Sequence, residues 1–408
     1  MKAALIASLC LGSFAHALEV HEWGTFTVLS GSAGNHIPWY AGYEDLARLP
    51  DFVSPGIMSK SGAAKIRMET PVIYFYPEKE MKVSVDVSFE SGTVTETFPH
   101  TSGDVIRVDP FTGILVRGKW TGTLHPPTDK KALAHIPAIK ESAHAEPYGA
   151  AREVPDAWIF ESDLKEIPGL KDQPHFPQME KFIFYRGAGN GFIPVTAAMS
   201  GETATITNYS DSALPFGVAL RVRDGKAAWV SVSPIAGKTT DGTPAMNQTQ
   251  ITFPKPDRSM DEVESELAGE WKKALAADGL TSAEASAMVE TWRKTWFREN
   301  GDRILTLVPR NTIDALLPLK ITPAPAKTER VFVARIEMLA PEREQALVAL
   351  LNSSEETGEA SFAEFEKLAL GRFANGALES AIQIQSGKMR EKFFAYGRFA
   401  ESRGTSQR

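Results

Sequence analysis

Up to about residue 255, the sequence consists of short runs in which apolar and polar residues alternate. Gly, Pro and Asp residues separate these runs. In the run 82–89, valines and Phe89 alternate with polar residues, so one face of a strand should lie on a core. Ser91-Gly92 predicts a turn, and residues 93–98 should return as the antiparallel partner of that strand.

Further runs extend this pattern. The runs 71–76 and 182–185 are apolar throughout and predict strands that are covered on both faces. The runs 218–222 and 228–232 predict a hairpin, because a turn with a glycine separates them. Short, regularly spaced strands of this kind indicate one or two antiparallel β-sandwiches, and we assign this region to residues 18–255.

Beyond residue 256 the apolar residues recur at helical spacing. Thr281 and Glu284 form the pattern of a capping box, and Trp292 and Trp296 follow it one helical turn apart. We therefore expect a mainly helical C-terminal region over residues 256–403.

Two predicted strands, 303–308 and 329–338, interrupt these helices. The pattern leaves open whether they pair together or join the N-terminal sheet. The predicted fold class is α+β: an N-terminal antiparallel β-sandwich-type region, then a mainly helical C-terminal part with two strands, and a disordered tail at 404–408.

The N-terminus has the pattern of a signal peptide, residues 1–17. One basic residue precedes the apolar run 3–14, and an Ala-x-Ala motif ends it, so we expect cleavage after residue 17. A lipoprotein would use Cys10, but Leu9 stands where a small residue is required. No later run is long and apolar enough for a transmembrane segment. We expect a soluble periplasmic or secreted protein.

Composition and charge narrow the function classes. Cys10 is the only cysteine and lies within the predicted signal peptide, so thiol nucleophiles, zinc ribbons and iron–sulfur clusters are excluded from the mature chain. The formal net charge of −7 at pH 7 disfavours nucleic acid as a partner, because binding it requires a basic surface.

Charged side chains fall on apolar faces of two predicted strands. In the segment 20–29, alternation places Glu22 on the side of Phe26, and further along the chain it places Arg186 on the side of Phe184. An unpaired buried charge is very costly, so we expect each of these residues to meet an opposite charge.

A third strand repeats the pattern, and there Arg67 and Glu69 should face as Ile73 does. If the three strands are neighbours, their charges gather in one polar pocket. Its predicted members are Glu22, Glu69, Arg67, Arg186 and the adjacent His21.

This predicted cluster has two interpretations. Glu22 and Glu69 could act as acid and base, or as acid and nucleophile, on a glycosidic or similar bond. Alternatively, the cluster is a buried Glu–Arg network that fixes strand register and performs no chemistry. Carboxylates about 5–10 Å apart on the floor of an open cleft favour the first interpretation. Carboxylates sealed against arginines favour the second.

Motifs for metals and cofactors are incomplete. His21-Glu22 begins like the motif of a zinc-protease helix, but Thr25 stands where the second histidine is required. No helix start follows the glycine-rich segment 187–191, so it lacks the helix N-terminus that would hold a phosphate. We assign no metal ligands and no cofactor, while a site assembled from distant histidines stays open.

Loop aromatic residues raise the question of sugar binding. Trp39, Tyr40 and Tyr148 lie in predicted loops, where exposed rings could stack on a sugar. The alternative is that these rings hold their loops against the core. The chain has no Gly-x-Ser-x-Gly motif, which disfavours a common serine hydrolase.

Three segments carry a resemblance to known proteins: His21–Thr27, Met68–Tyr76 and Phe184–Gly187. They resemble a group of exported bacterial proteins that have no assigned function, as do the later segments 291–297 and 316–321. The resemblance spans most of the mature chain and implies export and a single evolutionary unit, but no activity.

Our leading hypothesis is therefore a non-catalytic binding or scaffold protein of the cell envelope, with a polysaccharide or a cell-envelope protein as partner. The alternative is an exported hydrolase that uses the Glu22/Glu69 carboxylate pair.

Overall fold

The computed structural model describes most of the chain between residues 18 and 400. The predicted signal peptide, Tyr40 and the predicted tail lie outside the described residues. The structure describes residues 18–39, 49–55, 64–102, 105–109, 113–140, 146–166, 177–232, 234–238, 247–353, 357–383, 392 and 395–400.

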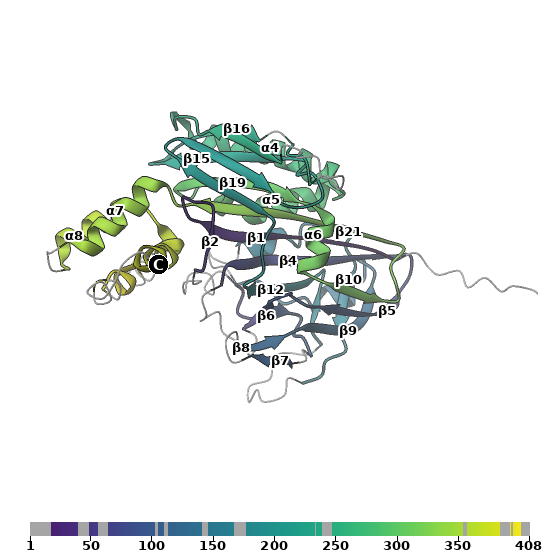
Figure 1. Ribbon diagram of the computed structural model, residues 1–408. Coiled ribbons are helices and arrows are strands. Elements are labelled where there is room, and N and C mark those ends of the chain that lie inside the picture. The colour runs from purple at the N-terminus through teal and green to yellow at the C-terminus, as the bar shows by residue number, and fades with distance from the viewer. Residues whose placement is uncertain are drawn as a thin grey trace, which may run out of the picture.

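One 11-stranded sheet forms the body of the molecule (Figure 1). β1 and β4 lie near its centre, and β2 pairs with β1 at one end. The strands run in the order β18 (Arg258–Ser259), β16 (Lys226–Val232), β15 (Gly217–Arg223), β19 (Gly301–Val308), β21 (Lys327–Met338), β1 (Leu18–Ser30), β4 (Ile66–Pro77), β12 (Ile183–Gly189), β6 (Gly92–Phe98) and β3 (Ser54–Pro55), with β2 at His36–Ile37.

The two late strands join this large sheet and also pair with each other. β19 pairs antiparallel with β21, and β21 pairs parallel with β1, from Glu19 opposite Lys327 to Ser30 opposite Met338. β1, the first described strand, and β21, the last one, therefore lie side by side in the middle of one sheet.

A five-stranded sheet covers part of one face of the large sheet. Its strands are β11 (Met179–Glu180), β10 (Ile159–Ser162), β9 (Gly118–His125), β5 (Met81–Val87) and β20 (Leu319–Thr322). Val85 and Trp120 of this sheet share a core with Phe26 and Ile73 of the large sheet. We call this side of the large sheet the sheet face.

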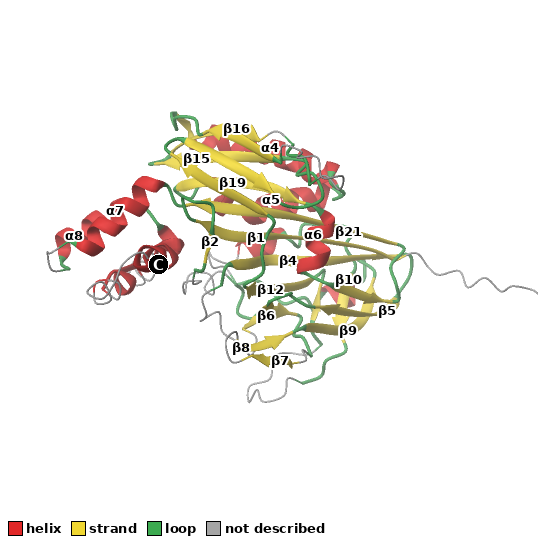
Figure 2. Ribbon diagram, viewed as in Figure 1, coloured by secondary structure: helices red, strands yellow, loops and turns green. Residues whose placement is uncertain are grey.

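Two long helices cover the opposite side, which we call the helix face (Figure 2). They are α4 (Met260–Ala277) and α5 (Ser282–Phe297), and their Trp271 and Trp296 share a core with Trp23 and Tyr74 of the large sheet. The tryptophan face predicted for the second helix is thus buried.

The two long helices differ in how their first turns are capped. At α5, Thr281 and Glu284 form the predicted capping box, with hydrogen bonds in both directions. Ser259 precedes α4 as its N-cap, but its side chain makes no capping bond. Among the described helices, none has the length and apolar character needed to cross a bilayer.

Smaller elements complete the described chain. The other helices are α2 (Lys130–Leu133), α3 (Glu146–Ala150), α6 (Arg310–Leu316), α7 (Pro341–Asn352), α8 (Glu359–Lys367), the 3₁₀ helix η1 (Gly371–Phe373) and α9 (Ala374–Gln383). Two small sheets consist of β13 (Val195–Ser200), β14 (Thr203–Asn208) and β17 (Gln248–Thr252), and of β7 (Val105–Asp109) and β8 (Gly113–Val116). The C-terminal helices α7–α9 gather around Trp39 in a separate core at one end of the large sheet (Figure 1).

One predicted hairpin is wrong. β5 and β6 do not pair, because β5 lies between β9 and β20 in the five-stranded sheet while β6 pairs with β12 and β3 in the large sheet. The turn at Ser91, which has a φ of 57°, therefore carries the chain from one sheet to the other. The predicted hairpin of 218–222 with 228–232 is confirmed as β15 and β16.

The fold is mixed and dominated by sheets, with a sheet-rich N-terminal region and helices that lie mostly in the C-terminal part. The finer assignment of the N-terminal region to a β-sandwich stays a prediction.

Candidate functional site

A β-bulge interrupts β4 directly after Glu69. Trp23 of β1 lies opposite Val72 of β4, and Thr25 lies opposite Glu69. The two positions are two residues apart on β1 but three residues apart on β4. The extra residue falls at Thr70-Pro71, and Thr70 has a φ of 49°. A β-branched residue rarely adopts this left-handed conformation, so the bulge holds Thr70 in a strained backbone.

The bulge corrects our expectation for this strand. Because the extra residue reverses the alternation of β4, Arg67 and Glu69 point to the helix face, whereas Ile73 and Phe75 point to the sheet face. The sequence pattern had predicted one common face for all four residues.

A second bulge lies on the other side of β12. Tyr185 pairs with Thr97 of β6, and Gly187 pairs with Val94. These positions are two residues apart on β12 but three residues apart on β6, so β6 carries the extra residue. Arg186 therefore lies between two bulged strands. It shares the helix face with Phe184, as alternation predicts, and its guanidinium lies 5.8 Å from the centre of that ring.

Charged and aromatic side chains at the bulges surround a small cavity on the helix face, which we call the arginine pocket. Its cavity volume of about 30 Å³ gives room for roughly two waters. The pocket is lined by Leu49, Glu69, Thr70, Pro147, Tyr148, Phe184, Arg186, Thr291, Trp292, Thr295 and Arg372.

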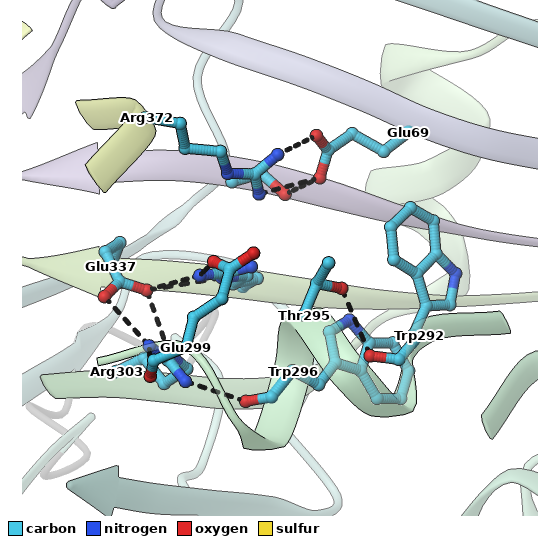
Figure 3. A network of polar contacts seen from close by, with 10 residues as sticks. Glu69, Trp292, Thr295, Trp296, Glu299, Arg303, Glu337 and Arg372 are labelled. Carbon is cyan, nitrogen blue, oxygen red and sulfur yellow. Dashed lines mark hydrogen bonds and ion pairs between the residues drawn. The ribbon is translucent and has the colours of Figure 1, made fainter. Parts of the chain in front are cut away.

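Glu69 is held on its side of the pocket by an arginine from the C-terminal region. Arg372 of η1 donates from Nη1 at 2.6 Å and from Nη2 at 3.3 Å to the carboxylate, and the Thr27 hydroxyl donates to Oε2 (Figure 3). The Arg372 guanidinium also lies 5.2 Å from the centre of the Trp39 ring. Glu69 thus connects the central strands to the C-terminal helices.

Two other lining residues, Arg186 and Trp292, carry hydrogen-bond donors. Arg186 directs Nε and Nη2 to the Thr70 hydroxyl, at 3.4 Å each. The indole Nε1 of Trp292 is buried and has no hydrogen-bond partner within the described part of the chain. Such buried donors are normally satisfied, so this N–H keeps the capacity to bind an acceptor.

A second buried ion network lies near Arg372 on the helix face (Figure 3). Arg335 donates to Glu299 at 2.6 Å and to Glu337 at 2.9 Å, and Arg303 donates to Glu337 at 2.9 Å. Burial opposes ionisation of Glu299 and Glu337, but the nearby guanidinium charges hold the pKa of both carboxyls below the usual range. The network ties the end of α5 to β19 and β21.

Glu22 lies on the sheet face and has a different arginine. Its carboxylate accepts from Nε of Arg330 at 2.5 Å and from the Tyr185 hydroxyl, and all three side chains are buried. Arg330 also donates from Nη1 to Asp314 at 2.7 Å. Burial, followed by the charge of Glu22, raises the pKa of Tyr185 well above its ordinary value.

The single polar pocket that we predicted is therefore divided between the two faces of the large sheet. Glu22 points to the sheet face, and Glu69 points to the helix face, each sealed against its own arginine. Two carboxylates that act on one bond must face it from a common cleft. The Glu22/Glu69 pair does not have this arrangement.

Arg67 and His21 each have separate partners. Arg67 donates to the Trp39 carbonyl at 3.1 Å and stacks 4.7 Å from the centre of that ring. His21 contacts Glu284 through Nδ1 at 2.9 Å. Burial opposes ionisation of Glu284, but hydrogen bonds with His21 and Tyr76 hold its pKa below the usual range. These contacts anchor the start of α5 to β1.

The predicted aromatic surface is not exposed. Trp39 is fully buried between Arg67 and the C-terminal helices, and Tyr148 is buried with its hydroxyl donating to Glu180 at 3.1 Å. Both rings are packed into the core, as in the alternative interpretation, but Tyr148 lies in α3 and not in the predicted loop. Tyr40 lies outside the described residues.

A separate cluster joins Glu80, His125 and Asp129, whose potential ligand atoms lie within 4.8 Å of one another. Both nitrogens of His125 already face carboxylates, of Glu80 and of Glu161, at 2.7 Å each. Partial burial lowers the pKa of His125, but these hydrogen bonds outweigh it and raise the pKa. Because both ring nitrogens are already engaged by carboxylates, this arrangement is explained by ion pairing without a metal.

Sequence reasoning missed the partner arginines Arg330 and Arg372. Arg330 lies on a strand where alternation places it on the same side as the buried residues Phe332 and Ala334. This pattern was a usable signal that Arg330 is buried. Arg372 follows the short helix α8 and carries no periodic signal, so only the folded chain brings it to Glu69.

No family model matches this sequence, and no curated protein matches it. Among solved structures, the chain shows a likeness to the yeast delta-COP-I mu-homology domain, covering 79% of this chain and 98% of that chain at 6% identity and a TM-score of 0.28. The same domain complexed with the Dsl1 WxWxV peptide gives 5% identity, the same coverage and the same TM-score. A likeness this low carries no argument about fold or function.

Proposed function

We propose that the chain is an exported, non-catalytic binding protein of the cell envelope that holds an acidic group of its partner in the arginine pocket. The partner is a polysaccharide or a protein of the envelope. Export rests on the signal-peptide pattern of residues 1–17. The observation that carries the binding role is the pocket lining, which combines two guanidinium groups, one carboxylate and the buried Trp292 N–H.

The pocket chemistry favours a carboxylate as the bound group. Guanidinium groups match the planar geometry of a carboxylate, and the lining carries one more positive than negative charge. The cavity is too small for a sugar ring, so only a terminal group of a larger partner would enter it. The strained Thr70 supports this assignment, because strained backbone concentrates at functional sites.

The absence of a shared cleft for Glu22 and Glu69 supports the non-catalytic half of the proposal. Each carboxylate is neutralised by an arginine and by a hydroxyl donor, and neither is available to a substrate in this arrangement. Glu22 and Arg330 lie directly opposite one another on β1 and β21, so their pairing favours one strand register.

The proposal is tested by calorimetric titration of the mature chain with paired ligands. Oligogalacturonate is compared with its methyl ester, and an oligoglutamate peptide with the corresponding oligoglutamine. We expect at least one acidic ligand to bind and its neutral counterpart to bind at least about tenfold more weakly. Arg186→Gln should lower the affinity for the acidic ligand by a similar factor.

Arg258→Gln is the matched control, because Arg258 is partly exposed, pairs with Glu266 and lies outside the pocket. It should leave the affinity unchanged. Equal binding of acidic and neutral ligands, no binding of either acidic ligand, or equal affinities of the Arg186 variant and the native chain would each contradict the proposal.

A further inference from the structure

A second, larger pocket opens beside α6 and the end of α4. Its cavity volume of about 540 Å³ lies within the range of small-molecule sites, about 300–1,000 Å³. It is lined by Ser212, Ala213, Pro215, Asp278, Val308, Pro309, Arg310, Asn311, Asp314, Glu329 and Arg330. We call it the mixed-charge pocket.

Arg330 supplies a hydrogen-bond donor that the protein leaves unused. Its side chain is buried, with Nε on Glu22 and Nη1 on Asp314. Nη2 is also buried, yet it has no hydrogen-bond partner in the described part of the chain. Leaving a buried charged donor unsatisfied is expensive, so this nitrogen, on a residue that lines the pocket, has the capacity to bind an oxygen of a ligand.

The other wall of the pocket carries excess negative charge. Asp314 is neutralised twice, by Arg310 at 2.9 Å and by Arg330 at 2.7 Å. Glu329 has one exposed partner, Lys327, at 3.2 Å. Asp278 makes no ion pair or hydrogen bond through its carboxylate with any described residue, although it is half-buried. The Asp278 carboxylate therefore has no positive partner among the described residues, and a cationic group of a ligand could neutralise it.

The negative charges of Asp278 and Glu329 repel one another, and this repulsion favours a cation between them. Burial first, and then the charge of Glu329, raises the pKa of Asp278 to about 6. Glu329 also lies close to the turn after α4, because a Cβ placed on Gly279 would come within 2.8 Å of its Oε2. Two acids held near one another are stabilised when a bound cation neutralises them.

We propose that the mixed-charge pocket binds a small molecule carrying a primary ammonium group together with a hydrogen-bond-accepting oxygen. The ammonium group lies against Asp278 and Glu329, and the oxygen accepts a hydrogen bond from Nη2 of Arg330. This site is separate from the arginine pocket, because the two pockets share no lining residue and the arginine pocket takes an acidic group.

A divalent metal ion fits the lining less well. The ligands of a metal ion must converge on one point. Within the described residues, the acidic side chains of this pocket form no group of three whose oxygens come close enough to share an ion. Two arginines in the lining also oppose a bare cation.

The test titrates the mature chain at neutral pH with four probes: L-alaninamide, n-butylamine, N-acetyl-L-alaninamide and Ca²⁺. L-Alaninamide has both required groups, n-butylamine lacks the oxygen, and N-acetyl-L-alaninamide lacks the ammonium group. We expect L-alaninamide to bind at least about tenfold more tightly than either of the other organic probes.

Asp278→Asn should weaken L-alaninamide binding at least about tenfold, while Glu270→Gln, an exposed change on the same helix, should not affect it. Thermal melting of both variants checks that they fold. Absence of L-alaninamide binding, equal binding of n-butylamine, or binding of Ca²⁺ that Asp278→Asn abolishes would overturn the proposal. None of these outcomes bears on carboxylate binding in the arginine pocket.

Discussion

At the scale of single residues, the charges inside this protein are arranged as specific pairs. Glu22 has Arg330 and Glu69 has Arg372, and each pair is completed by a hydroxyl group. Burial makes each pair sensitive to the loss of one member, because the remaining charge cannot be hydrated. It does not follow that the pairs stabilise the fold relative to apolar residues of the same size.

Glu22→Gln is predicted to lower the free energy of unfolding by about 3 kcal/mol, since Arg330 would then keep a buried charge with weaker compensation. Urea unfolding measures this loss. In the double variant with Arg330→Met, the total loss should be smaller than the sum of the single losses. Strictly additive losses would show that the two side chains do not interact.

At the scale of elements, the bulge in β4 decides which side chains reach the arginine pocket. One extra residue turns Arg67 and Glu69 to the helix face while the rest of the strand keeps its apolar contacts. The cost is the left-handed backbone at Thr70.

Thr70→Gly is therefore predicted to be more stable than Thr70→Ala by about 1 kcal/mol, because glycine adopts a positive φ without a Cβ penalty. Both variants lose the hydroxyl group, so the comparison isolates the backbone. The same pair of substitutions at Thr121, an exposed position in β9, should give the opposite order. Chemical denaturation distinguishes the two orders, and an alanine variant at position 70 as stable as the glycine variant would argue against strain there.

The elements themselves could largely be predicted from the sequence, but their partners could not. Periodicity located β5, β6 and α5, since alternation and helical spacing are local properties. Pairing depends on contacts between distant residues, so the pattern wrongly joined β5 to β6 and left the neighbours of β19 and β21 open. Pro71 was a usable signal for the bulge, because proline inside a strand is confined to edges and irregular positions.

For the candidate site, the sequence identified the central acids and Arg186 but not their arrangement. Strict alternation placed Glu22 and Glu69 on one core, and a single inserted residue at Thr70 separates them. The arginines that neutralise them come from the last fifth of the chain, and no local pattern links positions so far apart.

At the scale of the whole molecule, stability should depend on pH through Asp278. Its pKa in the folded protein is about 6, above the ordinary value of 3.8, because of burial and then the charge of Glu329. Folding thus favours the neutral form. The contribution of Asp278 to stability is complete below about pH 3.8 and is lost as the pH rises through about 6.

Asp278→Asn stays neutral at every pH, so at about pH 7.5 it should be more stable than the native chain by on the order of 1 kcal/mol. The figure allows for screening by solvent at this partly exposed site. The advantage should shrink toward about pH 4, which thermal melting at both pH values would measure. An advantage that is equal at both pH values would contradict the raised pKa.

The parallel pairing of β1 with β21 has a consequence for how the chain is made. Synthesis proceeds from the N-terminus, so the segment that will occupy the centre of the main sheet emerges early, while one of its two neighbours is among the last segments translated. Until about residue 338 is available, β1 has an open edge that can attract other extended chains. A truncation that ends before β21 should therefore yield a protein that aggregates rather than a smaller folded unit.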